Sequence, residues 1–390
     1  MTSSGLGAGV LGALLLAATA GCAANGPQDP ASASTAKGQA AVTVDEVQIA
    51  SLSETEIERL FHEASAQLLK DDFVPAAETF DRVVRADPAG RAAVPSLFNA
   101  GIAYHGMGKL DLALERFKAS IAQGPEAATT KDAHLRLTRI YGQLERWQDL
   151  EKAAAVALAR GDLTVLERIG ARGALGLGLI EQGRVEDAQT AIFKARDEIE
   201  DHKLGMSGVP PLELAQVAFA LGEIRRVKGE KIKFVPFPPD FAAVFEERCT
   251  QLLDAQSAYQ DAMRSLDAHW SAMAGFRVGQ LYHQLHKDVM EIPLPANAKT
   301  LREKQLWEGS MRVRYRILLE KGLKGMKATV ELGERTGESS SWVSRAREAK
   351  KELEAALERE KEAIAKLPVS EEDIRGALED LRDKNQPKKP

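Results

Sequence analysis

Apolar side chains in the middle of the chain recur at helical spacing, in a pattern that is copied several times. In its clearest copy, residues 97–125, large apolar or aromatic positions alternate with small ones, and Gly108 and Pro125 interrupt the segment. Apolar positions three and four residues apart predict amphipathic helices, while Gly commonly ends a helix and Pro stops one. The pattern therefore predicts two helices joined by a tight turn, which cross closely at the small residues Gly101 and Ala113.

Copies of this pattern lie before and after residues 97–125. The equivalent positions are Leu60, Ala64, Phe73, Ala76, Phe80, Val84 and Pro88 in the preceding copy, Leu137, Tyr141, Trp147, Leu150, Ala154, Ala157 and Leu158 in the next, and Leu175, Gly176, Leu179, Gly183, Val185, Ala188, Ile192 and Ala195 in the last. Their order resembles the 34-residue tetratricopeptide repeat (TPR). The resemblance implies four helical hairpins over residues 57–202, with Gly222 and Gly229 indicating a degenerate fifth. Because one hairpin cannot bury its apolar face alone, the copies should stack.

Longer helices are predicted after the repeats. Residues 240–291 read as helical, with a break near Asp254 or Gly275. An apolar stripe predicts one continuous helix over residues 300–335, and another helix begins near Ser341. The predicted fold class is therefore all-α, a TPR helical-hairpin solenoid followed by long packed helices.

The first residues of the chain are apolar without helical alternation. Residues 6–20 carry no charge and are too short to span a bilayer, which needs about 20 apolar residues, so they read as part of a signal peptide. Residues 16–22, Leu-Ala-Ala-Thr-Ala-Gly-Cys, resemble the bacterial lipobox, which implies a diacylglycerol on Cys22. The two alanines that follow imply sorting to the outer membrane, facing the periplasm. The alternative is an ordinary signal peptide cleaved near Ala20, and the chain is exported in either case.

These patterns divide the chain into five parts. The parts are a signal peptide (1–21), the lipidated Cys with a disordered tether (22–50), the TPR solenoid (51–232), a long-helix region (233–368), and a short helix with a disordered tail (369–390). The tether is rich in Ala, Gly, Ser and Thr, a composition that cannot bury enough apolar surface to fold.

Composition and motifs argue against several classes of function. The net charge is −5, so nucleic-acid binding, which needs a strongly basic surface, is not expected. The chain lacks the nucleophile and metal motifs of common hydrolases, so we expect no enzymatic activity, no cofactor and no small-molecule substrate. His283 and His286 could form part of a metal site, but packing is the preferred interpretation because no second cluster supplies ligands. Cys249 lies among apolar residues and is predicted to be buried.

A partner-binding groove is the first candidate surface. TPR ligands lie along the first helix of each hairpin, and the resemblance places the groove at Phe61, Leu68, Phe98, Ile102, His105, Leu135, Arg139 and Leu177. A mainly apolar groove suits an amphipathic helix or an extended apolar segment. The alternative is that later helices of this chain cover Phe98 and Leu135.

A basic patch around Arg312, Arg314 and Arg316 is the second candidate surface. It belongs to residues 299–327, in which nine Lys or Arg face three Glu. Pairing with the acidic C-terminal helix is the preferred interpretation. An acidic partner or an anionic envelope polymer is the alternative.

The lipobox, tether, repeats and charged C-terminal half together resemble the TPR lipoproteins of the myxobacterial envelope, in particular those of adventurous gliding motility. The resemblance implies a periplasm-facing scaffold, held at the membrane by its lipid, that binds other cell-envelope proteins within a gliding-motility complex. An outer-membrane or cell-wall assembly lipoprotein is the alternative of the same class. A metal-dependent envelope hydrolase is the alternative of a different class.

Overall fold

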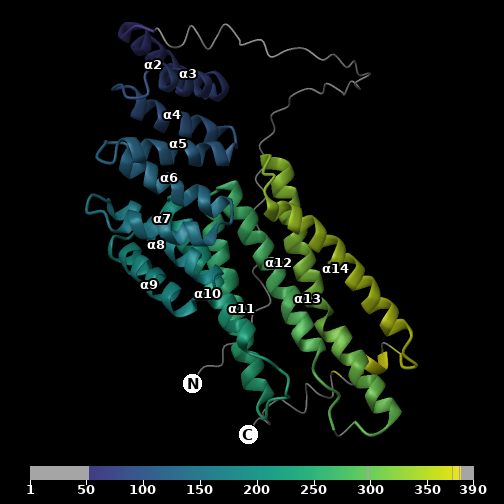
Figure 1. The fold of residues 1–390 in the computed structure, drawn as a ribbon. Coiled ribbons are helices and arrows are strands. Elements are labelled where there is room, and N and C mark those ends of the chain that lie inside the picture. Colours follow the sequence, from purple (N-terminus) through teal and green to yellow (C-terminus); the bar gives the residue numbers. More distant parts are fainter. Residues whose placement is uncertain (1–51, 297, 371, 377, 379–390) are drawn as a thin grey trace, which may run out of the picture. The chain divides into compact units, whose positions relative to one another are not determined.

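The computed structural model describes residues 52–296, 298–370, 372–376 and 378 (Figure 1). Over these residues all regular secondary structure is helical. The prediction of an all-α fold is therefore confirmed. The predicted signal peptide, Cys22, the whole of the predicted tether and residues 379–390 of the predicted C-terminal tail lie outside the described residues.

Four helical hairpins open the described part of the chain. They pair α2 (Glu54–Leu68) with α3 (Phe73–Ala86), α4 (Ala93–Gly106) with α5 (Leu110–Gln123), α6 (Thr130–Gln143) with α7 (Trp147–Leu158), and α8 (Val165–Glu181) with α9 (Val185–Asp201). Equivalent residues such as Leu60 and Leu97 are slightly further apart than the 34 residues of the TPR consensus. The extra length lies in the turns between hairpins, such as the one that begins at Asp87 and Pro88. The predicted array of TPR-type hairpins is confirmed.

Small residues set the crossing of the two helices within a hairpin. A Cβ atom on Gly101 would lie 2.8 Å from Cε1 of Phe117 on the facing helix. Ala113 is completely buried beside it. The same arrangement recurs in the fourth hairpin, where Gly176 faces Ile192. The crossing positions predicted from the sequence are therefore the ones the hairpins use.

A fifth, wider hairpin joins α10 (Leu212–Lys231) and α11 (Phe241–Met263). Gly222 of α10 faces the ring of Tyr259 on α11, which repeats the pairing of a small residue with a ring at the crossing. The predicted boundary between solenoid and long-helix region, at residue 232, falls in the loop between these two packed helices.

Three long helices complete the fold: α12 (Ala268–Met290), α13 (Leu301–Thr336) and α14 (Ser341–Ala365). The continuous helix predicted over residues 300–335 is present. It begins with a capping box, in which the Thr300 hydroxyl accepts from the Glu303 amide and the Glu303 side chain accepts from the Thr300 amide. It ends at Gly337, whose φ of 75° is a left-handed conformation. A Cβ atom on Gly279 of α12 would lie 3.0 Å from the Gly322 carbonyl oxygen of α13, so these helices cross closely.

The break between α11 and α12 corrects a prediction. It lies after Met263 and not near Asp254 or Gly275. The Asp267 carboxylate accepts a hydrogen bond of 2.9 Å from the Trp270 amide and so caps α12, and Leu266 before it has a φ of 59°. A local cap therefore decides the break, while the glycine stays inside a helix.

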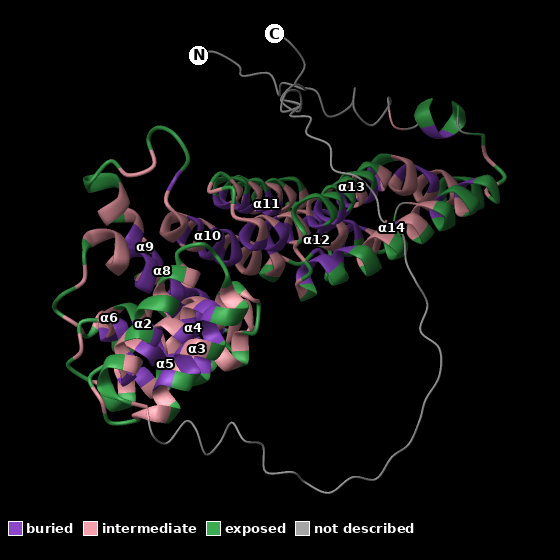
Figure 2. Ribbon diagram, turned by 90° about the horizontal axis from the view of Figure 1, so that it is seen from above, coloured by how far each residue is buried: buried purple, intermediate pink, exposed green. Residues whose placement is uncertain are grey.

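One apolar core runs through hairpins and long helices alike (Figure 2). It extends without interruption from Phe98 of the second hairpin to Trp342 and Val343 of α14. Cys249 lies at its edge and is only half-buried, so its predicted full burial is not found. The described residues accordingly form one compact unit.

Candidate partner-binding groove

The first helices of the hairpins carry most of the predicted groove residues with part of their surface in water. The half-buried members are Phe61 and Leu68 on α2, Ile102 and His105 on α4, and Leu135 and Arg139 on α6. An apolar side chain that stays partly exposed on a regular helix face can be buried further by a partner. Whether a partner binds here remains a prediction.

Phe98 and Leu177 are core residues and not part of an accessible groove. Leu177 is 0% exposed and Phe98 is 8% exposed. The Phe98 ring makes an edge contact with Phe117, with ring centroids 5.6 Å apart, and the Arg136 guanidinium covers it at 5.8 Å. These side chains stabilise the hairpins because they are already desolvated, which removes them as docking anchors.

Helix α10 covers this face of the fourth hairpin, so the groove does not continue along α8. Gly170 and Gly173 let α10 approach α8 closely, since a Cβ atom on Gly170 would lie 2.8 Å from Cγ of Glu213. Leu177 lies one turn beyond Gly173 on this face. No first helix of the earlier hairpins has such a glycine pair at these positions, and the groove residues of α2, α4 and α6 keep part of their surface exposed.

Later helices also reach Leu135, as the alternative interpretation proposed. Leu135 and Arg139 line a cavity of about 60 Å³ together with Gln216 of α10 and Trp270 of α12. That volume is far below the 300–1,000 Å³ of typical ligand sites. Phe98, by contrast, is covered by Arg136 of the next hairpin and not by the C-terminal helices.

The turn between α13 and α14 lies against the carboxyl ends of α4 and α6. The Ser341 hydroxyl donates to the Glu145 carboxylate at 2.5 Å, and the Arg345 guanidinium donates to it at 2.9 Å. A cavity of about 480 Å³ lies beside these contacts, lined by His105, Gly108, Leu110, Gln143, Leu144, Glu145, His269, Gly337, Glu338, Ser339, Ser340 and Ser341. The third hairpin is therefore hydrogen-bonded directly to α14.

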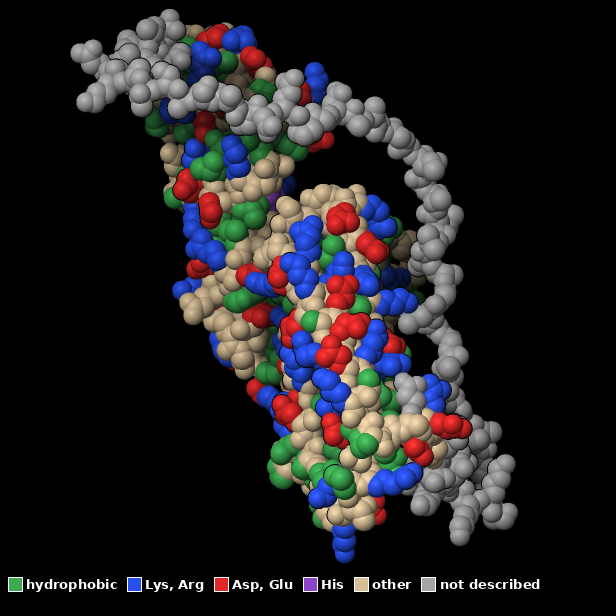
Figure 3. Space-filling view, turned by 90° about the vertical axis from the view of Figure 1, so that its right-hand side faces the viewer, with side chains coloured by type: hydrophobic (Ala, Val, Ile, Leu, Met, Phe, Trp, Pro, Cys, Tyr) green, Lys and Arg blue, Asp and Glu red, His purple; other side chains and the backbone are tan. Residues whose placement is uncertain are grey.

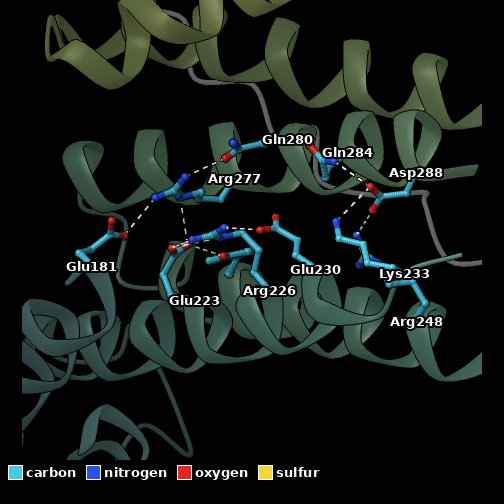
Figure 4. Close-up of polar contacts among 11 residues, drawn as sticks. Glu181, Glu223, Arg226, Glu230, Lys233, Arg248, Arg277, Gln280, Gln284 and Asp288 are labelled. Atoms are coloured by element: carbon cyan, nitrogen blue, oxygen red, sulfur yellow. Dashed lines mark hydrogen bonds and ion pairs between the residues drawn. The ribbon is translucent and has the colours of Figure 1, made fainter. Parts of the chain in front are cut away.

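A buried ionic network joins α8, α10, α11 and α12 (Figure 4). The Glu223 carboxylate is 0% exposed. It accepts hydrogen bonds from the Tyr259 hydroxyl at 2.5 Å and from Arg226 at 2.6 Å, and Nε of Arg277 lies 2.9 Å away. Nη2 of Arg277 donates a hydrogen bond of 3.0 Å to the Glu181 carboxylate. Breaking such a buried network is costly because a charge would be left without a partner.

The two glutamates of this network have opposite pKa shifts. Burial and the negative charge of Glu223 raise the pKa of Glu181 to about 7, although Arg277 opposes them. Burial also acts to raise the pKa of Glu223, but the charges of Arg277 and Arg226 outweigh burial and lower it. One carboxyl group in the network therefore holds its charge while the other is close to protonation at neutral pH.

The basic patch on α13 is largely paired. Arg312 bonds Glu308 at 3.0 Å and Glu360 of α14 at 2.8 Å, and Arg316 lies 3.3 Å from Glu320. Arg314 is exposed and lies over the ring of Tyr315. Acidic and basic side chains are interspersed over the side of the molecule that carries α14 (Figure 3). Pairing with α14, the preferred interpretation, accounts for Arg312.

The histidine pair on α12 has a packing role. His286 is 7% exposed, and His283 lies 3.7 Å from the carboxylate of Glu352 on α14. Burial lowers the pKa of both imidazoles. The described residues hold no group of three or more His, Cys, Asp or Glu arranged to bind a metal ion. In the same residues, no helix is long and apolar enough to cross a membrane.

Comparisons with known proteins concern the fold. No protein-family model matches the chain, and no curated protein matches it. A tetratricopeptide repeat protein from Parabacteroides merdae is 14% identical over 76% of this chain and 98% of its own, with a TM-score of 0.42. Pseudomonas aeruginosa PilF is 12% identical over 70% of this chain and 97% of its own, with a TM-score of 0.36. A TPR protein from Cytophaga hutchinsonii is 10% identical over 78% of this chain and 99% of its own solved part, with a TM-score of 0.38. At these values no function is carried over to this chain.

Proposed function

We propose that this chain is a scaffold that holds a segment of another protein along the partly exposed face of α2, α4 and α6. The observation that supports this proposal is that Phe61, Leu68 and Ile102, which the TPR resemblance places along the groove, remain partly exposed on the first helices α2 and α4. Peptides commonly bind to helical surfaces by filling such a row of apolar positions. The fixed stacking of the hairpins would hold the row ready for a partner without a cost in ordering.

The place of action belongs to the same proposal. The lipobox-like residues 16–22 support attachment to the outer membrane through Cys22, with the hairpins in the periplasm. The partners would then be cell-envelope proteins. The combined layout of lipobox, repeats and charged helices favours a gliding-motility complex, with outer-membrane or cell-wall assembly as the alternative. The identity of the protein bound at Ile102 distinguishes these two roles.

Site-specific photo-crosslinking in the native cells tests the docking face. A photoreactive amino acid replaces Ile102 on α4, and in a matched control it replaces Val156, an apolar residue on α7 that is 49% exposed. We expect a discrete crosslinked protein from position 102 and none from position 156, because only the first helices carry the groove. The same products from both positions, or none from position 102, would overturn the proposal.

A further inference from the structure

Arg136 lies on α6, next in the chain to the groove residue Leu135, and its guanidinium has no ionic partner among the described residues. It lies over the Phe98 and Phe117 rings, 5.8 and 6.0 Å from their centroids. Burial and the charge of Arg139 lower its pKa, against a smaller opposing effect of Asp132. The contacts of the described residues give it no hydrogen bond and no ion pair. A cation that is partly removed from water without a counter-charge destabilises the protein that carries it.

The other partly buried arginines of the hairpins have carboxylate partners, whereas Arg82 and Arg85, which have none among the described residues, are exposed to water. Arg116, on the preceding helix, also lies over an aromatic ring, that of Tyr104, but it bonds both oxygens of the buried Asp81 at 2.7 and 2.9 Å. Arg168 bonds Glu198 at 2.8 Å. Arg136 and Arg116 therefore both lie over aromatic rings. They differ because Arg116 has a carboxylate partner and Arg136 has none.

Two further basic groups face the same region from α4 and α6. Arg139 lies 3.9 Å from its nearest carboxylate, that of Glu213 on α10, which is the outer limit of an ion pair. The charges of Arg136 and Arg139 add to burial in lowering the pKa of His105, whose ring contacts Gln143. Arg136 thus lies near one weakly paired arginine and near a histidine whose lowered pKa leaves its imidazole uncharged at neutral pH.

We propose that Arg136, with Arg139 and His105 beside it, receives the carboxylate of an acidic residue in a partner segment whose neighbouring residues are apolar. This inference rests on the proposed function and names the chemistry of its partner. A guanidinium offers parallel N–H donors that match a carboxylate, and stacking on Phe98 already fixes the plane of Arg136. The apolar neighbours would fill the positions at Ile102 and Leu68. A bare anion would leave these positions empty, so an acidic peptide fits better.

Peptide selection tests the proposed chemistry. Random twelve-residue peptides displayed on phage are selected on the purified full-length chain and on its Arg136→Met variant. We expect peptides selected on the unaltered chain to be enriched in Asp or Glu beside large apolar residues. On Arg136→Met the acidic enrichment should disappear and the apolar enrichment should remain. Peptides without acidic enrichment, or with the same enrichment on both proteins, would overturn the inference.

Binding by the best selected peptide separates this inference from the proposed function. Replacing its acidic residue by the amide should raise Kd about tenfold or more on the unaltered chain, as loss of a charge-assisted hydrogen bond implies, and should change nothing on Arg136→Met. Ile102→Asp should abolish binding of both peptides; unchanged binding by Ile102→Asp would contradict the proposed function as well. Displacement by millimolar inorganic phosphate as effective as that by the peptide would indicate an anion site only, and would overturn the inference.

The melting temperature gives a second test. Replacing an arginine that only stabilises the fold would lower the melting temperature, whereas the inference predicts no such loss. Arg136→Met removes an uncompensated charge and keeps a long apolar side chain over Phe98, so the variant should melt at or above the temperature of the unaltered chain. The matched variant Arg116→Met leaves Asp81 with only the Tyr104 hydroxyl as partner and should melt lower. A loss in Arg136→Met as large as in Arg116→Met would show that Arg136 stabilises the fold, against the inference.

Discussion

Single small residues determine how closely the helices of each hairpin approach. Gly101 faces Phe117, Gly176 faces Ile192 and Gly222 faces Tyr259. In each pair a large side chain occupies the space that a Cβ atom would take. The same physical solution therefore recurs in hairpins whose sequences differ widely.

Gly101→Leu should lower the midpoint of thermal unfolding by several degrees. The new side chain would have to displace the buried Phe117 ring, and overpacking of this kind costs about 1–3 kcal/mol. Circular dichroism at the helical band measures the change. Gly142→Ala is the control, since a Cβ atom on Gly142 meets no atom within 4 Å and alanine favours the helix; it should melt at or above the unaltered chain. Equal melting of both variants would mean that the crossing is not tightly packed.

Residue types predicted the hairpins, but not which apolar groove positions are accessible. Phe98 and Ile102 occupy one helix face by periodicity, yet Phe98 is buried because Arg136 and Phe117 cover it. The sequence of α4 does not show that Arg136 of the next hairpin covers Phe98. For the same reason the sequence did not indicate Arg136, whose lack of a carboxylate depends on side chains from other helices.

At the scale of elements, local signals and long-range packing decide different features. The capping box at Thr300 fixes the start of α13, and the sequence predicted that helix well. The close contact of α8 with α10 depends on Gly170 and Gly173, two positions that the repeat pattern does not single out. Long-range ion pairs, such as that between Glu181 and Arg277, cannot be inferred from helical periodicity, because it does not specify which helices meet.

Glu181→Gln should make the protein more stable than the unaltered chain at pH 7.5, by a difference that becomes smaller as the pH falls toward 4. The folded protein raises the Glu181 pKa to about 7, above the value near 4.3 of an unfolded chain. Between these values the folded state binds more protons, so this group's contribution to stability falls as pH rises toward and through 7. Glutamine keeps the acceptor for Arg277 and removes the titration. Melting temperatures of both proteins from pH 5 to 8 measure the difference, and a constant difference would contradict the assignment.

At the scale of the whole molecule, α14 fastens the long helices to the hairpins. Trp342 is 2% exposed, and two guanidinium groups lie over its ring, that of Arg277 at 5.1 Å and that of Arg345 at 4.5 Å. Arg345 in turn bonds Glu145 of the third hairpin. Arg277 also belongs to the buried ionic network and donates a hydrogen bond to Glu181 of α8. Trp342 of α14 is therefore linked to the hairpins through Arg277. The hairpins and long helices are therefore expected to unfold together.

Cys22→Ser in the full-length chain should move the protein from the outer membrane to the soluble periplasmic fraction while leaving its unfolding transition unchanged. Serine cannot form the thioether that carries diacylglycerol, and acyl chains supply a membrane affinity of about 0.8 kcal/mol per buried CH₂. The described fold makes its core from residues 52–376, so loss of the lipid should not disturb it. Fractionation and melting of the two proteins are compared, with Cys249→Ser as a control that keeps the anchor. Retention of Cys22→Ser in outer-membrane vesicles at the unaltered level would refute lipidation as the means of attachment.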